Sequence, residues 1–482
     1  MFKKISINTI VVSVGKVVGV FASWVTLGLI THTLGKESFG DYSTIFAYLL
    51  TLQAFADFGL HTVLTRELSK HTEQEQKNKI FREFLGVRLI LVMVVLAIGL
   101  CAIFLFPYDS HIKIGVVLAS LSVVLMSIPQ IFLGVFQSNI TSYKYSVAEL
   151  AGRLTHLGIV AVLVFVFAAT SFLLFVGAFV GSLFIFFVFA LFLVRKEITL
   201  SIALPPKQLK PILRSTLPIG IAIFFSVMYF RSDTIMLSLL QDSEAVGLYS
   251  VGYKIFEALL FFPAMLFGLF LPALSRSVQK ARRELGSEMS FLVNLALVIV
   301  LPLVVCGVLF SASIIQVIGG SEFLPATTTL QILFGSLGVI VFGALFGNAI
   351  IAMNAQREAL WAYGAGFVFN IIANLIVIPR YSYEGAAYTT LATEIIVTGI
   401  LAYIVYRRAR FTVWLRVGVV SVLAAFVMGY SMFSLIHPVS IPVALLSMVG
   451  VAGLGLALYV GVVSVLLPSF YEKYSVFAES WK

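Results

Sequence analysis

The sequence predicts an all-α polytopic membrane protein with about fourteen transmembrane helices, arranged as two pseudo-symmetric six-helix bundles plus two C-terminal helices. Three observations predict this fold class. The 482 residues are 60% hydrophobic and 11% charged, with a mean hydropathy of +1.06, whereas soluble domains carry roughly 25% charged residues. Apolar runs of about 20 residues, each long enough to cross a bilayer, recur along the chain. A short motif occurs twice, about half the chain apart.

The apolar runs follow one another with short loops between them. A span and its loop take roughly 35 residues, so the chain has room for about fourteen spans and for little soluble domain. A barrel would instead alternate apolar and polar residues in segments of about ten. The N-terminus starts like a signal peptide, but its apolar part is too long and we interpret it as an uncleaved first span. The predicted spans are Ile5–Ile30, Gly40–Leu60, Phe84–Phe106, Ile112–Phe136, Val147–Ala168, Phe172–Val194, Leu213–Leu239, Val246–Leu271, Phe291–Phe310, Thr328–Ala352, Leu360–Ile378, Gly385–Tyr406, Val417–Leu435 and Ile441–Leu467.

The basic residues of the loops segregate to one side of the membrane. With the N-terminus in the cytoplasm, only Lys36, Lys113 and Arg380 fall on the outer side. Because cytoplasmic loops carry the excess of lysine and arginine, this pattern predicts an even number of spans with both termini in the cytoplasm. We expect a multi-pass protein of the cytoplasmic (inner) membrane. The same loops account for the net charge of +10, which therefore does not indicate nucleic-acid binding.

The repeated motif reads "FGDYS" at the start of the second span and "VGLYS" at the start of the eighth. Gly40 and Gly247 are separated by 207 residues (247 minus 40). Six spans lie between the copies, so both face the same side, as in a parallel repeat about an axis along the membrane normal. Asn139 and Asn354 form a weaker correspondence. Two such bundles around a central cavity, rocking against each other, indicate a transporter that works by alternating access.

The repeat sets the predicted domains. They are an N-terminal six-helix bundle over 1–195, a proline-containing cytoplasmic linker over 196–212, a C-terminal six-helix bundle over 213–406, and two extra helices with a cytoplasmic tail over 407–482. The two extra helices lie outside the repeat. They are open to two interpretations, peripheral packing or a groove for a lipid tail.

Several motifs carry a resemblance to a known family. They are "LGKESFGDYS", "ADFGL", "DTIMLSLLQDSEAVGLYSVGYKI", "PALSR" and "FNIIANLIVIPRYSYEGAAYTTLATE". In this order they resemble the polysaccharide flippases of the multidrug/oligosaccharidyl-lipid/polysaccharide exporter superfamily, and most closely the O-antigen (Wzx-type) group, over spans one to twelve. One position departs from the pattern, because the family usually has a glycine after the Pro-x-Tyr turn and this chain has Ser382.

The resemblance implies a function and partners. It implies that the protein flips an undecaprenyl-diphosphate-linked oligosaccharide from the inner to the outer leaflet, for surface polysaccharide biosynthesis. The partners it implies are this lipid-linked substrate and membrane lipids. Glycan polymerases or chain-length proteins of the same pathway are further candidates, and we expect the flippase to work as a monomer.

Basic residues inside the spans are the candidates for binding the diphosphate, because buried charges are costly and face a cavity or a partner. The set is Lys16, Arg88, Arg153, Arg231 and Lys254. Lys16 lies about 15 Å into its span at about 1.5 Å per residue, and it has no acidic neighbour in the sequence. Arg88 and Arg153 lie near the cytoplasmic boundary, either as entrance cations or as snorkelling anchors. Arg231 and Lys254 have nearby acidic residues, so a structural ion pair is the alternative for each.

Acidic residues inside the spans are the candidates for ion coupling. We consider Asp233, Glu257 and Glu394, while H⁺, Na⁺ and the membrane potential all stay open as driving forces. Asp57 is interpreted as a tether for the inner end of the second span. Asn370 and Asn374 form a polar stripe, which favours hydrogen bonding between helices over sugar contact.

Other function classes fit the sequence less well. No phosphate-binding glycine-lysine loop, zinc pair or nucleophile elbow occurs, so we expect neither an enzyme nor a cofactor. A drug or small-cation exporter of the same superfamily should carry an excess of acidic residues in its spans, but basic residues are at least as many here. A membrane glycosyltransferase or polymerase should carry a sizeable outer loop, and the outer loops are short. A purely structural scaffold does not explain the charges inside the spans.

Overall fold

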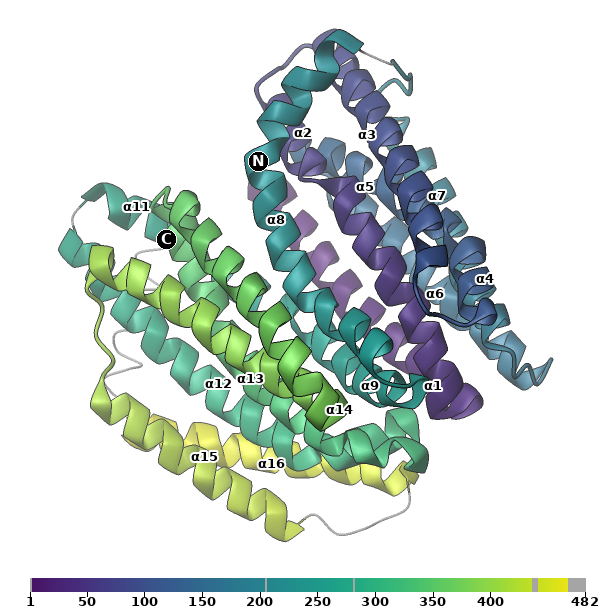
Figure 1. Cartoon of the computed structure of the whole chain (residues 1–482). Coiled ribbons are helices and arrows are strands. Elements are labelled where there is room, and N and C mark those ends of the chain that lie inside the picture. The colour runs from purple at the N-terminus through teal and green to yellow at the C-terminus, as the bar shows by residue number, and fades with distance from the viewer. Residues whose placement is uncertain (1, 204–205, 281, 436–440, 467–482) are drawn as a thin grey trace. The chain divides into compact units, whose positions relative to one another are not determined.

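The computed structural model is helical throughout (Figure 1) and describes residues 2–203, 206–280, 282–435 and 441–466. These residues contain no β-strand, and the all-α prediction is confirmed. The first half consists of α1 (Phe2–Asp57), α2 (Leu60–Ser69), α3 (Gln74–Ala102), a 3₁₀ turn (Ile103–Leu105), α4 (Ser110–Ala119), α5 (Leu121–Ser138), α6 (Tyr143–Phe165), α7 (Phe172–Val194) and α8 (Pro206–Leu240). The second half consists of α9 (Ser243–Leu259), α10 (Phe261–Gly268), α11 (Leu271–Lys280), α12 (Arg282–Gly319), a 3₁₀ turn (Ser321–Ala326), α13 (Thr327–Ala352), α14 (Gln356–Ala409), α15 (Leu415–Leu435) and α16 (Ile441–Leu466).

The described helices account for every predicted span. Ten helical stretches of the described residues are long and apolar enough to cross a membrane. Two of them, Val11–Ser69 and Gln356–Ala409, are bent and hold two predicted spans each. The helices α8 and α16 cover the remaining two predicted spans. Each of the fourteen predicted spans therefore corresponds to a described helix or to part of one.

The two long bent helices change direction at a single residue each. α1 bends at Gly35, with φ 69° and ψ 178°, and α14 bends at Ser382, with φ 49° and ψ −134°. Residues with a side chain rarely adopt a positive φ, whereas glycine does so at little cost. Ser382 is the position at which the resembled family usually has glycine, so the bend gives that family preference a physical reason.

The chain forms two compact units. Unit 1 consists of Met1–Val251, Ile318–Glu322 and Asn370–Ala386, and unit 2 consists of Gly252–Val317, Phe323–Phe369 and Ala387–Lys482. Each has its own apolar core. In unit 1 a core cluster joins α2, α3, α5 and α7 through residues such as Phe81, Phe132 and Phe186. The predicted domain boundaries, which follow the sequence repeat, stay a prediction.

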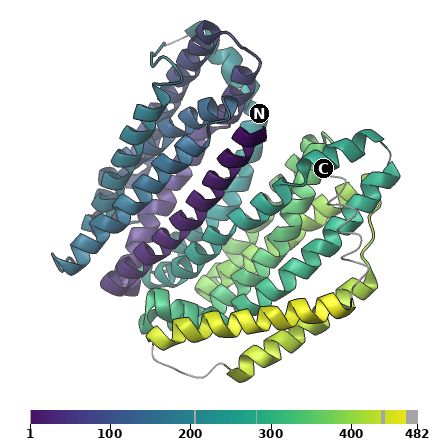
Figure 2. The same ribbon diagram turned by 180° about the vertical axis from the view of Figure 1, so that it is seen from behind.

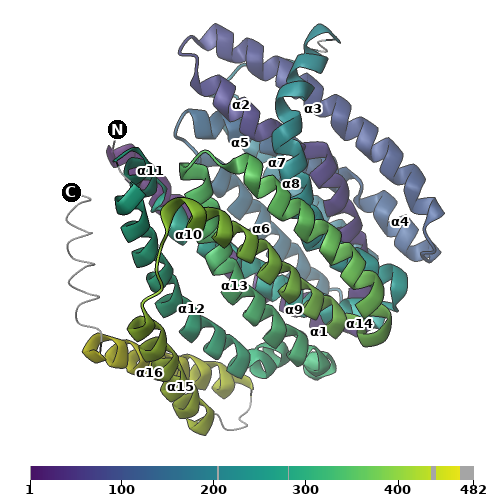
Figure 3. The same cartoon turned by 60° about the vertical axis from the view of Figure 1, so that its left-hand side comes forward.

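The two C-terminal helices pack together within unit 2 and lie beside α12 (Figures 2 and 3). Met428, Met432 and Tyr459 from α15 and α16 belong to the apolar core of this unit. The Tyr459 hydroxyl donates a hydrogen bond to the carbonyl of Val298 in α12, at 2.8 Å. These contacts attach the two extra helices to the side of unit 2, as the packing interpretation expects.

Candidate functional site

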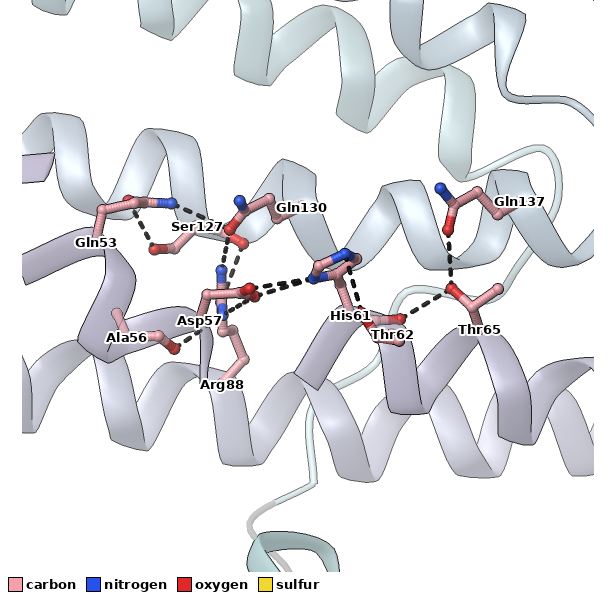
Figure 4. Close-up of polar contacts among 10 residues, drawn as sticks. All are labelled: Gln53, Ala56, Asp57, His61, Thr62, Thr65, Arg88, Ser127, Gln130 and Gln137. Carbon is pink, nitrogen blue, oxygen red and sulfur yellow. Dashed lines mark hydrogen bonds and ion pairs between the residues drawn. The ribbon is translucent and has the colours of Figure 1, made fainter. Parts of the chain in front are cut away.

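Arg88 of α3 is the centre of a buried polar network (Figure 4). Its side chain has no exposed surface. The guanidinium donates from Nη1 to Asp57 Oδ1 and to the carbonyl of Ala56, both at 2.8 Å. It also donates from Nε to the carbonyl of Ser127 at 3.1 Å and from Nη2 to Gln130 Oε1 at 2.6 Å. One carboxylate and three neutral oxygens therefore satisfy this charge.

The sequence-based alternative for Arg88, a snorkelling anchor at the interface, is wrong because three helices converge on the side chain and remove it from the surface. Asp57 is the last residue of α1 and forms an ion pair with Arg88 of α3. Its predicted role as a tether for the inner end of the second span is therefore confirmed. His61 Nδ1 lies 3.1 Å from Asp57 Oδ2. Gln53 extends the network by donating to Gln130 at 3.1 Å and accepting from Ser127 at 3.2 Å.

Arg153 of α6 is half-exposed and bridges α6 to α1. Its Nη2 lies 2.7 Å from Glu149 Oε1, four residues earlier on the same helix. Its Nη1 donates to Ser23 Oγ at 2.9 Å and, more weakly, to the carbonyl of Gly19 at 3.4 Å. Gly19 lets the arginine lie close against α1, since a Cβ there would come within 3.0 Å of Arg153 Cδ. The side chain keeps 41% of its surface exposed.

Lys16 of α1 is exposed and has no ion-pair partner in the described part of the chain. At about 100° per residue, Lys16 and Ser23 lie on nearly the same face of the helix, about 10 Å apart along its axis. The exposed apolar residues Val18 and Phe21 lie on the other side of α1. Because Arg153 reaches Ser23, Lys16 and Arg153 share one cationic face of unit 1.

Asp233 of α8 is fully buried and accepts three hydrogen bonds from neutral groups. Tyr249 donates its hydroxyl to Oδ2 at 3.0 Å, and the amides of Asn370 and Asn374 donate to Oδ1 at 2.9 and 2.6 Å. The Ser232 hydroxyl donates to Asn370 Oδ1 at 2.6 Å. The asparagine stripe therefore joins helices by hydrogen bonds, as the sequence favours. Tyr249 is not among the predicted site residues, although it is the tyrosine of "VGLYS", the second copy of the repeated motif.

The remaining candidates divide between the two units. Arg231 is half-buried on α8 in unit 1, and Lys254 and Glu257 are half-buried on α9 in unit 2. Glu394 is buried on the second part of α14, also in unit 2. Within unit 1 the structure brings Lys16 and Arg153 to one face and sets Arg88 apart in the core. A single cavity lined by all five cations stays a prediction.

Comparison with known proteins identifies relatives by sequence. The family model described as polysaccharide biosynthesis protein matches residues 5–278. A protein of Haloferax volcanii named probable low-salt glycan biosynthesis flippase is 21% identical over 388 residues, which cover 80% of this chain and 79% of that protein.

Comparison of structures identifies the fold. A lipid II flippase, MurJ, in an inward closed conformation matches with a TM-score of 0.76 at 14% identity, over 96% of this chain and 99% of that chain. An inward-facing multidrug resistance MATE family transporter of the MOP superfamily matches with a TM-score of 0.59 at 11% identity, over 80% of this chain and 93% of that chain. The helices of this chain therefore adopt the fold shared by these transporters.

Proposed function

Since the chain belongs to the polysaccharide biosynthesis protein family, we propose that it flips an undecaprenyl-diphosphate-linked oligosaccharide from the inner to the outer leaflet of the cytoplasmic membrane, for O-antigen or similar surface polysaccharide. The single observation that carries this proposal is the cationic face of unit 1, where exposed Lys16 and half-exposed Arg153 lie on adjoining helices. The name and length of the Haloferax relative support it.

The chemistry of the substrate explains this need for cations. A diphosphate carries about two negative charges and cannot cross hydrocarbon unpaired. Arginine offers a planar fork to phosphate oxygens, and lysine offers a point charge. Lys16 has no ion-pair partner among the described residues, so its charge can reach a substrate without breaking such a pair. Arg153 is only partly occupied, because Glu149 and Ser23 leave much of its surface exposed. Arg231 and Lys254 are proposed as further cations of the pathway.

We assign Arg88 a different role from the one the sequence suggested. All three nitrogens of its guanidinium are bound to protein oxygens, so a phosphate would have to break these bonds to reach it. Its proposed role is to fix α1, α3 and α5 against one another. Arg88 holds the part of α1 that ends at Asp57, whereas Lys16 lies on the part of α1 before the bend at Gly35.

Asp233 is the strongest of the candidates for ion coupling. A buried carboxylate that accepts hydrogen bonds from movable donors, as Asp233 does from Tyr249, Asn370 and Asn374, can gain a proton or a cation when those donors move, and such a change in occupancy can couple an ion gradient to transport. Glu257 and Glu394 stay candidates for ion coupling, as the sequence predicts. The response of transport to an imposed Na⁺ or H⁺ gradient tests which ion drives the cycle.

The competing function is export of a drug or small cation, which the shared MATE fold permits. Reconstitution in liposomes separates the two. We expect the purified protein to move a fluorescent undecaprenyl-diphosphate glycan between leaflets and to leave a lipophilic cation such as ethidium untransported. Transport of ethidium without movement of the glycan would contradict the proposal. Variants at Lys16, described below, then test the site itself.

A further inference from the structure

The two copies of the repeated motif touch each other in unit 1. A Cβ placed on Gly40 would lie 1.7 Å from the carbonyl oxygen of Ser243, and a Cβ placed on Gly247 would lie 2.0 Å from the carbonyl oxygen of Lys36. Real Cβ atoms do not approach backbone oxygens this closely. Only glycine therefore allows α1 and α9 to cross at this distance.

The contact is reciprocal. Lys36 precedes Gly40 by four residues, and Ser243 precedes Gly247 by four residues. The same offset of 207 residues relates both pairs (243 minus 36, and 247 minus 40). Each glycine thus packs on the backbone one turn before the other glycine. Two helices related by a two-fold axis produce this pattern where they cross on the axis, which agrees with a parallel repeat.

Polar contacts hold the crossing together at its rim. Lys36 Nζ lies 2.6 Å from Glu244 Oε1, and both side chains are about half-exposed. The Ser243 hydroxyl donates to Asp41 Oδ1 at 2.6 Å, and Asp41 Oδ2 lies 3.0 Å from His111 Nε2. Ion pairs that are half-exposed form and break at a small cost in free energy.

Beneath the crossing lie two buried hydroxyl groups. Ser43 and Ser250, again 207 residues apart (250 minus 43), follow the two glycines by three residues and lie on nearly the same helix faces. Neither hydroxyl has a hydrogen-bond partner in the part of the chain that the structure describes. A buried hydroxyl without a partner costs free energy, and contact with water removes that cost. These serines therefore favour a contact that opens to water over a permanent one.

We propose that the glycine crossing, formed by residues 36–43 and 243–250, is the gate on the side of the membrane that the basic loops predict to be outer, and that the structure holds it closed. The two glycines set how tightly it closes, the Lys36–Glu244 pair adds to closure, and hydration of Ser43 and Ser250 favours opening. This inference rests on the proposed transport by alternating access. It assigns the motif glycines a role in the cycle, separate from substrate binding.

Accessibility of Ser250 tests the gate without any substrate. The background carries Cys101→Ser and Cys306→Ser, and Ser250→Cys reports the opening by reaction with a membrane-impermeant maleimide added to intact cells. We expect Gly40→Ala and Gly247→Ala each to raise the labelling rate about tenfold, because overpacking by one methyl group shifts the equilibrium away from the closed state. Gly158→Ala and Gly177→Ala are matched controls, since a Cβ at either position meets nothing within 4 Å.

The outcomes separate cleanly. Labelling of folded Gly40→Ala and Gly247→Ala at the parent rate would overturn the proposal, as would an equal increase in the two controls. If either glycine variant fails to fold, Lys36→Ala tests the gate in the same assay. Removing this half-exposed ion pair should raise the labelling rate of Ser250→Cys about two- to fivefold. Unchanged labelling in Lys36→Ala would then count against the gate. The labelling result does not depend on whether Lys16 variants flip glycan. Failure of the gate and failure of the proposed function are therefore distinguishable.

Discussion

Arg88 and Lys16 are both basic residues inside predicted spans of the same unit, yet their surroundings are opposite. Arg88 is completely buried with four protein acceptors, and Lys16 is exposed with no ion-pair partner among the described residues. Depth in the span does not explain the difference, because the sequence places Lys16 deeper in its span than Arg88, yet Arg88 is the buried residue. What separates them is whether the fold itself supplies the oxygens that the cation needs, and this decides which cation remains available to a substrate.

The difference has an energetic reason. A charge buried at low dielectric is stable only when it is paired and its hydrogen bonds are complete, and removing one partner leaves an uncompensated charge. Arg88 meets this condition, so its loss should damage the fold. Lys16 is exposed and not held by such contacts among the described residues, so its replacement should leave the fold intact and weaken only the binding of an anionic substrate. The variants below test this contrast, from the largest expected effect to the smallest.

Replacing Arg88 should have the largest effect. Arg88→Ala leaves Asp57 buried without its cation, and breaking a buried pair costs about 3–5 kcal/mol. We expect little folded protein in detergent, measured by size-exclusion yield and melting temperature. Arg88→Lys should recover only part of the stability, because an ammonium cannot reproduce the fork of the guanidinium. An Arg88→Ala protein that melts like the parent but does not flip glycan would make Arg88 a substrate contact instead.

Asp233→Asn should have the next largest effect. The amide of the new asparagine cannot accept from Tyr249, Asn370 and Asn374 as the carboxylate does, and a mismatched buried donor costs about 1–3 kcal/mol. We expect a lower melting temperature and transport that no longer responds to an imposed Na⁺ or H⁺ gradient. Tyr249→Phe is the control, since it removes one donor and keeps the charge. A variant that keeps the gradient response would remove Asp233 from the coupling proposal.

Arg153→Ala should reduce flipping more than it reduces stability. Arg153 and Glu149 form a half-exposed pair in one helix, and such pairs contribute about 0.3–0.5 kcal/mol. We expect flipping in liposomes to fall about tenfold, in line with about 1.4 kcal/mol of lost phosphate binding. Glu149→Gln removes the partner and keeps the cation, so it should flip at least as well as the parent. Equal losses in both variants would favour a purely structural pair.

Ser382→Gly should have the smallest effect, and it should be stabilising. A residue with a side chain at positive φ costs about 1–2 kcal/mol, and glycine removes most of that cost. We expect a small rise in melting temperature with unchanged flipping. Ser382→Ala is the control and should give no rise, because alanine keeps the Cβ. A fall in stability with glycine would mean that the serine side chain contributes more than the strain at the bend.

The sequence predicted the helices better than the site, for a physical reason. Span positions follow from runs of apolar residues, which are local, so all fourteen lie on helix. The partners of Arg88 and of Asp233 come from other helices, 16 to 141 residues away, and no local spacing brings them together. The repeat was visible at Gly40 and Gly247, but the contact between its copies depends on how the helices cross.

The central claim is that Lys16 supplies a charge to the substrate diphosphate. The most direct test is the flipping rate of a defined undecaprenyl-diphosphate glycan by Lys16→Glu in liposomes, measured beside Lys16→Arg and the parent, with the melting temperature of each. We predict that Lys16→Glu melts like the parent and flips more than about tenfold more slowly, since reversing one exposed charge costs at least about 1.4 kcal/mol of anion binding, whereas Lys16→Arg retains flipping. Parent-like flipping by a folded Lys16→Glu protein would contradict the claim.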